Sequence, residues 1–226
     1  MLSTQTLIQL LADGKYHSGA ELGKQLKVSR AAVWKVIQKI ESELALPVYA
    51  VKGKGYRLQH ALELLDKNQI LENISKTTKK QLSTFDIVFD IDSTNQYLNK
   101  KSIEGAVSGY LVLAEQQTQG QGRRGRTWVS PFGGNLYLSL LWRFQDGPAQ
   151  LGCLSLFIAV AIIRALNQVG IKDAGVKWPN DIYWQGKKLA GILLEMRGEV
   201  NGPSAVVIGV GINISMSTEM TQNSVN

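Results

Sequence analysis

The sequence has few of the residues that build disulfides or metal centres. Its 226 residues include one cysteine, Cys153, and two histidines, His17 and His60. A lone thiol cannot form an internal disulfide, and ligands this scarce do not make a zinc cluster. Acidic residues are also in the minority, with 18 Asp plus Glu against 25 Lys plus Arg and a net charge of +7. The composition therefore excludes a disulfide scaffold and, in effect, a zinc protein.

Long hydrophobic segments are absent as well. The longest near-continuous apolar run, Leu151 to Ile163, has thirteen residues, whereas a helix that crosses a bilayer needs about 20. The run predicts a buried helix. Residues 1–9 show neither a basic region before an apolar stretch nor a small-residue cleavage site. With 44% apolar and 8% aromatic residues, we expect a globular cytoplasmic protein without a membrane partner.

The positive charge is concentrated near the N-terminus. Residues 1–60 contain nine Lys plus Arg and four acids, whereas residues 61–226 contain sixteen and fourteen. The length suits one or two domains, and the step in charge indicates where the smaller one ends. We predict a basic domain over residues 1–62, a linker helix over 63–82 and a larger domain over 83–226.

The first domain has the pattern of a winged helix-turn-helix. Apolar residues at helical spacing stop at Asp13-Gly14, Ser18 begins a capping box, and Ser29 can cap a third helix. Residues 48–51 and 56–58 then flank a glycine-rich basic tip, which is typical of a wing. The predicted DNA contacts lie on the exposed face of the third helix and on the wing: Ser29, Arg30, Trp34, Lys35, Lys39, Lys52 and Lys54. A small helical domain whose lysines only keep it soluble is the alternative.

The remaining chain alternates strands with few helices. Apolar residues between Ala61 and Gln81 predict the linker helix. Beyond it we predict two helices, over 95–101 and 149–169, and six strands, over 85–91, 109–116, 135–142, 176–178, 189–195 and 205–214. Successive strands follow one another without a helix between each pair, so an α+β fold with a mixed sheet is favoured over a doubly wound one.

A glycine- and arginine-rich loop over residues 120–126 is the most informative local motif. Its glycines match the G-x-G-x-x-G spacing of a dinucleotide fold, but Pro131 and two glycines follow where that fold needs a helix. The glycines allow a sharp turn, while the arginines offer forked donors that match phosphate or carboxylate oxygens. With Trp128 as an apolar wall, the loop predicts an anionic ligand. A basic surface loop that makes a second nucleic-acid contact is the alternative.

A second polar cluster follows a short apolar strand. Lys177, Asn180 and Asp181 end that strand, and Lys188 precedes the small-residue segment Leu189-Ala190-Gly191. Either Lys177 or Lys188 can neutralise a developing negative charge, and Asp181 can help to hold Mg²⁺ together with phosphate oxygens. A hairpin with solvated lysines is the alternative interpretation.

Six segments occur in the order and at the separations found in one protein family: 92–95, 120–126, 130–137, 177–181, 188–193 and 209–213. Together with the winged helix, they make the whole chain similar to the bacterial bifunctional biotin protein ligases, which also repress the biotin operon. The resemblance implies a catalytic domain like that of class II synthetases. It also implies activation of biotin by MgATP to biotinyl-5′-adenylate and transfer to a lysine of the carrier domain of acetyl-CoA carboxylase. The adenylate-bound protein would dimerise and bind operator DNA.

The resemblance also implies roles for single residues. Arg123, Lys177 and Lys188 match residues at the reacting groups. The positions that match biotin contacts are Ser93, Thr94, Asn95, Gln117, Gly120, Gln121, Gly122, Arg123, Lys188 and Gly191. The positions that match the nucleotide and metal side are Arg124, Trp128, Asn180 and Asp181, with Asp181 the expected Mg²⁺ ligand.

The sequence departs from the family pattern at two points. Gln121 stands where many members have arginine, which keeps a donor but loses a fixed charge. The chain stops at Asn226, where relatives continue through the rest of the catalytic domain and a small C-terminal β-barrel. We therefore expect either a ligase and repressor, or a shortened regulator that binds DNA and biotin without ligase turnover. A lipoate ligase is disfavoured by the winged helix and the arginine-rich loop.

Overall fold

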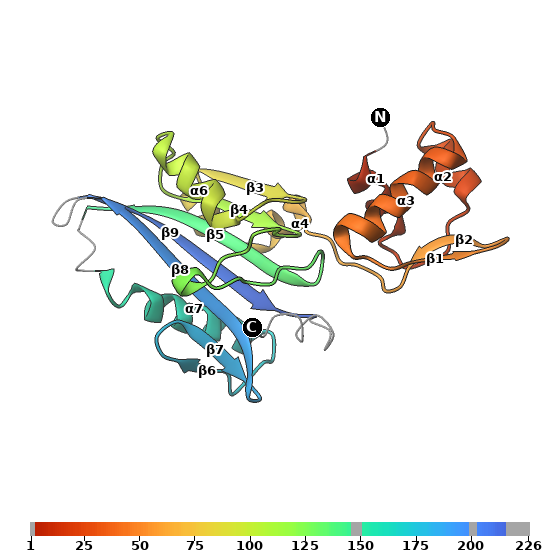
Figure 1. Ribbon diagram of the computed structural model, residues 1–226. Helices are drawn as coiled ribbons and strands as arrows, with labels where there is room; N and C mark the ends of the chain where they lie inside the picture. The colour runs from red at the N-terminus through yellow and green to blue at the C-terminus, as the bar shows by residue number, and fades with distance from the viewer. Residues whose placement is uncertain (1–2, 146–150, 199–202, 216–226) are drawn as a thin grey trace. The chain divides into compact units, whose positions relative to one another are not determined.

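The computed structural model (Figure 1) describes residues 3–145, 151–198 and 203–215. These residues belong to two compact units. The first consists of Met1–Leu65 with Pro131–Gly133, and the second of Asp66–Ser130 with Gly134–Asn226. Within the described ranges, no helix combines the length and the apolar character needed to cross a membrane.

The first unit begins with three helices, α1 (Thr4–Leu11), α2 (Gly19–Gln25) and α3 (Arg30–Leu44). Each starts at a serine whose hydroxyl accepts a backbone N–H of the first turn, a strongly preferred N-cap. Ser18 accepts from Ala20 and not, as a capping box predicts, from the next residue. The helices pack around one apolar core: Leu7, Ile8, Leu11, Leu22, Val33, Ile37, Ile40 and Leu44. The predicted helix-turn-helix is confirmed.

The wing is the hairpin of β1 (Val48–Val51) and β2 (Gly55–Leu58). A third short segment lies along β2, because His17 pairs antiparallel with Tyr56. Gly55 makes this approach possible. Its φ is +101°, and a Cβ there would lie 2.0 Å from the backbone oxygen of His17.

The predicted linker helix is wrong as a single element. The structure has two short helices instead, α4 (Lys67–Asn73) and α5 (Lys76–Gln81). Asp66 and Ser75 cap their first turns by accepting the N–H of Gln69 and Thr78. Between the helices Ile74 is extended, with ψ at 150°. The predicted helix is therefore divided at Ile74 and Ser75, because Ser75 caps a new helix inside an otherwise continuous apolar pattern.

The second unit is built on a seven-stranded sheet of order β3-β4-β5-β9-β8-β7-β6. Its strands are β3 (Thr84–Val88), β4 (Tyr110–Ala114), β5 (Asn135–Phe144), β6 (Gly175–Lys177), β7 (Asp181–Trp184), β8 (Lys187–Gly198) and β9 (Ser204–Asn213). Only β3 and β4 pair in parallel, so the predicted mixed α+β sheet is confirmed. The prediction missed β7, a four-residue strand that follows Pro179-Asn180 almost without a break.

Two helices cover opposite faces of this sheet (Figure 1). α6 (Thr94–Ile103) packs on β4, β5 and β9 around Leu98, and α7 (Leu154–Gln168) packs on β6, β7 and β8. Side chains alternate along β9, with Val207 in the α6 cluster and Val206 and Ile208 in the α7 cluster. Both faces of β9 are therefore buried, and this strand forms the centre of the core.

α7 is less buried than the apolar run predicted. Only Ala159 and Leu166 of this helix are buried, while Phe157 is 71% and Val160 46% exposed. A helix that lies on one face of a sheet contacts it along one side only, so its other side stays open to solvent. The predicted first residues of this helix, 149–150, lie outside the described residues.

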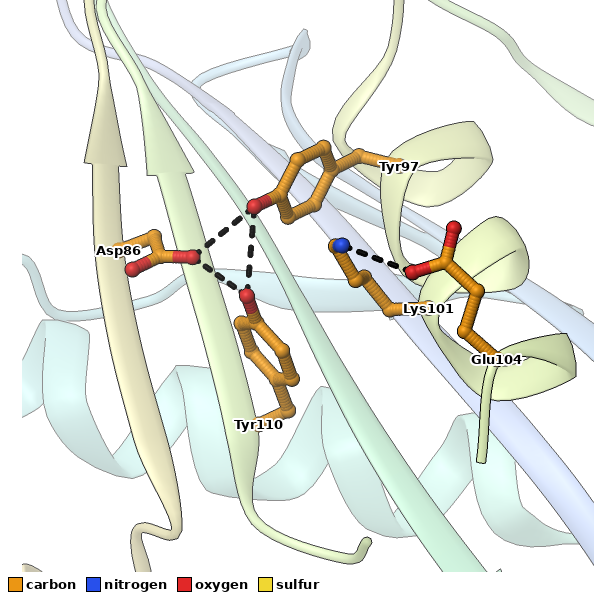
Figure 2. Close-up of polar contacts among 5 residues, drawn as sticks. All are labelled: Asp86, Tyr97, Lys101, Glu104 and Tyr110. Atoms are coloured by element: carbon orange, nitrogen blue, oxygen red, sulfur yellow. Dashed lines mark hydrogen bonds and ion pairs between the residues drawn. The ribbon is translucent and has the colours of Figure 1, made fainter. Parts of the chain in front are cut away.

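A cluster of two phenols and a carboxylate fixes α6 to the edge of the sheet (Figure 2). Tyr97 on α6 and Tyr110 on β4 both donate to Asp86 Oδ2 on β3, at 3.0 and 2.5 Å. Desolvation and the hydrogen bond to Asp86 raise the pKa of Tyr110 well above its ordinary value. Figure 2 also shows Lys101 bound to Glu104 at the end of the same helix, at 2.8 Å. These contacts hold the helix whose first residues enter the site.

Candidate active site

A pocket opens where α6 begins, on the α6 face of the sheet. The loop after β4, the β6–β7 connection and the middle of β8 and β9 complete its wall. The pocket brings together eleven of the residues predicted from the sequence: Ser93, Thr94, Asn95, Gln117, Gln121, Gly122, Arg123, Trp128, Asn180, Lys188 and Gly191. It adds six that the sequence analysis did not assign: Leu138, Ile192, Leu193, Gly209, Val210 and Gly211.

The inner wall consists of buried, uncharged polar groups. Ser93, the N-cap of α6, and the two residues after it are each at most 4% exposed. Gln117 joins this helix start to the loop. Its Oε1 accepts from the backbone N and the hydroxyl of Thr94, at 2.9 and 3.0 Å, and its Nε2 donates to Ser130 Oγ at 2.9 Å. The side chains therefore have defined positions without any ligand.

Two residues behind this wall hold it in place. Ser139 on β5 is fully buried, and its hydroxyl lies 2.6 Å from Asn95 Oδ1 and 2.8 Å from Thr94 Oγ1. Glu195 on β8 accepts from the side-chain amides of Asn95 and Asn99, at 2.7 and 3.0 Å. The sequence analysis missed both residues. Two features of the sequence could have indicated them: Ser139 is a polar residue at an inward position of β5, and Glu195 is an acidic residue within the apolar strand β8.

Three glycines form the floor of the pocket. Gly191 on β8 pairs with Gly211 on β9, and Gly209 lies two residues before Gly211 on the same strand. A Cβ at Gly209 would lie 2.2 Å from Asn95 Oδ1, and one at Gly211 would lie 2.5 Å from the Trp128 ring. Trp128 therefore lies directly against the strands, and its buried Nε1 has no hydrogen-bond partner among the described residues. Glycine is required here because other groups approach the backbone closely.

The arginine-rich loop folds back on itself at the mouth of the pocket. Gln121 bridges to Thr127, and a 3₁₀ turn, η1 (Arg123–Gly125), forms the tip. Arg124 there has φ 58°, a left-handed conformation rare outside glycine. Arg123 Nη1 donates to Asn180 Oδ1 at 3.0 Å. Asn180 is itself fixed because its Nδ2 donates to the Ile192 oxygen at 2.8 Å.

Lys188 brings a second positive charge to the pocket. Its Nζ lies 2.9 Å from Asp181 Oδ1 and 5.1 Å from the centre of the Trp128 ring. The neighbouring Lys187 is exposed. The two cations of the pocket, Arg123 and Lys188, thus contact Asn180, at the end of the β6–β7 connection, and Asp181, the first residue of β7.

Four predicted residues do not line the pocket. Gly120 supports it from behind, since a Cβ there would lie 2.3 Å from the Trp128 oxygen. Asp181 reaches it through Lys188. Arg124 is exposed. Lys177, on the edge strand β6, is exposed with its ammonium 4.6 Å from the centre of the Tyr183 ring.

The predicted DNA-binding residues lie on the surface of the first unit. Arg30, Trp34 and Lys35 project from α3 into solvent, and Trp34 is 51% exposed. Ser29 caps α3, and Lys39 lies 3.5 Å from Glu43 on the same helix. On the wing, the two predicted contacts are also exposed: Lys52 and Lys54.

Comparison with known proteins assigns the second unit. The model of the biotin/lipoate A/B protein ligase family matches residues 88–213, more than half of the chain. The chain belongs to this ligase family. A model of an HTH domain matches residues 3–57, the three helices and most of the wing.

Similar proteins match this ligase-family chain along most of its length, through the HTH region and the ligase region. It is 46% identical to the bifunctional ligase/repressor BirA of Salmonella typhimurium, and equally to that of Escherichia coli, over 93% of this chain and 63% of either relative. The bifunctional ligase/repressor BirA of Bacillus subtilis is 35% identical, over 92% of this chain and 64% of the relative. The chain thus spans less than two thirds of the length of these relatives.

Solved ligase structures share the fold. The biotin protein ligase of Leishmania major in complex with biotinyl-5-AMP has a TM-score of 0.52 at 28% identity, over 64% of this chain and 62% of that one. The ligase of Aquifex aeolicus in complex with biotin and ATP has a TM-score of 0.51 at 29% identity, over 62% and 57%. The resemblance to biotin protein ligases is confirmed.

Proposed function

We propose that this protein activates biotin with MgATP and transfers it to a lysine of a biotin carboxyl carrier domain, that of acetyl-CoA carboxylase. The observation that carries the proposal is a single pocket with a neutral polar wall, a glycine floor and two cations. The relatives named as bifunctional ligase/repressor, and the ligase structure in complex with biotin and ATP, support it.

The neutral wall suits the uncharged head of biotin. A ureido group presents one carbonyl oxygen and two N–H donors, and Ser93, Thr94, Asn95 and Gln117 offer hydroxyl and amide partners for both. Because these partners are buried and already hydrogen-bonded into place, binding costs little further ordering. The glycines beneath, Gly209 and Gly211, let Asn95 and the Trp128 ring lie against the strands and so form part of the wall that would face the fused rings.

The cations suit the reacting end. A biotin carboxylate oxygen attacks the α-phosphorus of ATP, the bond to pyrophosphate breaks, and a mixed anhydride forms. Arg123 and Lys188 would stabilise the negative charge on the carboxylate and on the phosphoryl oxygens during this step. The folded loop that carries Arg123 would keep water from the anhydride. The acceptor lysine, once it has lost its proton, then attacks the acyl carbon, and AMP leaves.

Asp181 is the proposed magnesium ligand, with Trp128 and Asn180 beside the nucleotide. Mg²⁺ is commonly held by one or two carboxylates together with substrate phosphates and water, so one carboxylate at the cationic end fits this mode. The ion would supply neutralisation of phosphate charge. Among the described residues, no group of three or more acidic, histidine or cysteine side chains forms a ready-made metal site.

We also propose that the first unit binds operator DNA and that the protein represses biotin synthesis genes as a ligand-induced dimer in the cytoplasm. The observation that carries this part is the match to an HTH domain together with the exposed basic and aromatic face of α3. A lysine-rich wing beside such a helix suits contacts to the DNA backbone.

Mass spectrometry of a purified biotin carrier domain tests the ligase proposal. The domain is incubated with the chain, biotin and MgATP, and we expect a mass gain of one biotinyl group that disappears when ATP is omitted. No gain from a chain shown to be folded would contradict ligase turnover. Binding of biotin and of operator DNA by the same sample would then indicate a regulator without catalysis.

A further inference from the structure

Three side chains form a row across the outward face of the wing sheet. Tyr56 and Leu58 of β2 point into the core, so Arg57 between them points away from it. Tyr49 is the register partner of Arg57 on β1. On the other side, the pairing of His17 with Tyr56 brings Tyr16 next to Arg57. The order across the sheet is therefore Tyr16, Arg57, Tyr49.

The two tyrosines hold the arginine between them. The guanidinium carbon of Arg57 lies 5.1 Å from the centre of the Tyr16 ring and 5.3 Å from that of Tyr49. Lys54, from the turn of the wing, places its ammonium 5.8 Å from the Tyr16 ring. All three distances fall within cation–π range. A guanidinium that contacts aromatic rings in this way keeps N–H groups available for an outside acceptor.

The charge of Arg57 has no acidic partner. Across the described ranges no carboxylate lies within ion-pair distance of it, and its buried Nε has no hydrogen-bond partner there. Asp13, three residues before Tyr16 in the chain, binds other groups, because its Oδ1 accepts from His17 and from the backbone N of Lys15, both at 2.9 Å.

We infer that Tyr16, Arg57 and Tyr49 form a clamp for a phosphate group of duplex DNA. The inference rests on the proposed DNA-binding function of this unit and extends it to a contact that lies on the strands, not on the wing tip. Tyr16 and Tyr49 are 38% and 44% exposed, so the row is accessible. Residues 1–60 contain nine basic and four acidic residues, which suits a polyanion. Arginine donates to phosphate oxygens in pairs, whereas Lys52 and Lys54 act as point charges.

Binding of the full chain to a random-sequence DNA duplex, measured by fluorescence anisotropy over a series of salt concentrations, tests the clamp. For Arg57→Gln we expect roughly tenfold weaker binding at low salt. We also expect the slope of log K against log salt to be smaller by about 0.9, the value for one phosphate contact. Arg57→Lys should retain the slope and lose affinity, because the charge stays while the planar fork is lost.

Two further variants separate the clamp from a general effect of charge. Tyr16→Leu keeps every charge and removes one ring, so it should weaken binding without a comparable change in slope. Lys79→Gln on α5, in the other unit, removes one charge and should leave binding unchanged. Circular dichroism confirms that each variant is folded.

The possible outcomes distinguish the clamp from the function on which it rests. If Arg57→Gln binds like the unmodified chain, or if Lys79→Gln loses as much affinity, the clamp is wrong while DNA binding stands. If the unmodified chain does not bind the duplex at low salt, both the clamp and the proposed DNA-binding function are wrong.

Discussion

In the pocket of the second unit, Ser93, Thr94 and Asn95 are at most 4% exposed, and Thr94 and Asn95 are hydrogen-bonded to strands far away in sequence. On α3 of the first unit, by contrast, Trp34 is 51% exposed and the neighbouring cations face solvent. The two surfaces suit different ligands. A neutral head group is recognised by fixed polar partners from which water is excluded, whereas phosphates are attracted by charges that stay hydrated until DNA arrives. Changes in the pocket should therefore have larger and salt-insensitive effects.

The largest effect is expected at the cationic end of the pocket. Lys188→Gln removes a charge from the place where we propose that negative charge develops, so the rate of biotin transfer should fall by about 10²–10³-fold, as for the loss of one transition-state donor. Lys187→Gln, which changes the adjacent exposed lysine, is the matched control. Single-turnover transfer to a carrier domain measures both. Equal transfer rates for Lys188→Gln and Lys187→Gln would show that Lys188 has no role in the reaction.

The loop should act on the intermediate more than on its formation. Arg123→Gly breaks the contact to Asn180 and removes the charge that we propose lies next to the phosphoryl group. Biotinyl-adenylate should therefore leave the protein at least about tenfold faster, since a charge-assisted contact is lost. Chromatography of filtrates after reaction with labelled ATP measures the release. Arg126→Gly is the control, and unchanged retention in Arg123→Gly would refute the assigned role.

The buried wall can be tested apart from the cations. Ser139→Ala removes the hydrogen bonds from Ser139 to Asn95 Oδ1 and to Thr94 Oγ1, which should cost about 1–3 kcal/mol of unfolding free energy or biotin affinity. Urea denaturation measures the loss of unfolding free energy, and calorimetric titration with biotin measures the loss of biotin affinity. Because no charge changes, the effect should not depend on salt. Ser42→Ala, on the exposed face of α3, should be neutral.

Ser139 also shows where prediction from the sequence ends. The arginine-rich loop and Lys188 were found because their patterns are local: a glycine spacing and a lysine before small residues. The residues at the start of α6 were found through the family resemblance of segment 92–95. Ser139 meets the pocket only because β5 pairs with β9, which puts it opposite Gly209. Lys177 shows the reverse case. The sequence places it in a polar cluster, but edge strand β6 directs it to Tyr183.

The same limit applies to the wing. Lys52 and Lys54 were predicted because they flank a glycine turn in sequence. Arg57 was not, since its two aromatic neighbours come from residues 16 and 49, and only the register of three strands brings them together. Local patterns therefore located both units, and the family resemblance most of the pocket, while contacts that depend on strand pairing required the structure.

The exposed face should respond to salt where the pocket does not. Lys35→Gln on α3 should weaken DNA binding roughly tenfold at low salt and reduce the salt slope by about 0.9, if the lysine contacts one phosphate. Biotin affinity should stay unchanged. Anisotropy titrations at three salt concentrations measure the first effect and calorimetry the second. If biotin affinity changed as much as DNA affinity, the pocket and the exposed face of α3 would not act as separate binding surfaces, and the comparison would be wrong.

The smallest effect is expected where α6 is fixed to the sheet. Tyr110→Phe removes the hydrogen bond to Asp86 and should lower the free energy of unfolding by about 1 kcal/mol at pH 7. The pKa of Tyr110 is raised in the folded protein. The stabilisation is therefore fully present below pH 10, the ordinary value for tyrosine, and decreases as the pH rises above it. Urea denaturation at pH 7 and pH 10.5 should show that the difference between the unmodified chain and Tyr110→Phe narrows at the higher pH. A difference that is the same at both pH values would mean that ionisation of this phenol is not coupled to folding, and that the hydrogen bond from Tyr110 on β4 to Asp86 on β3 does not stabilise the protein.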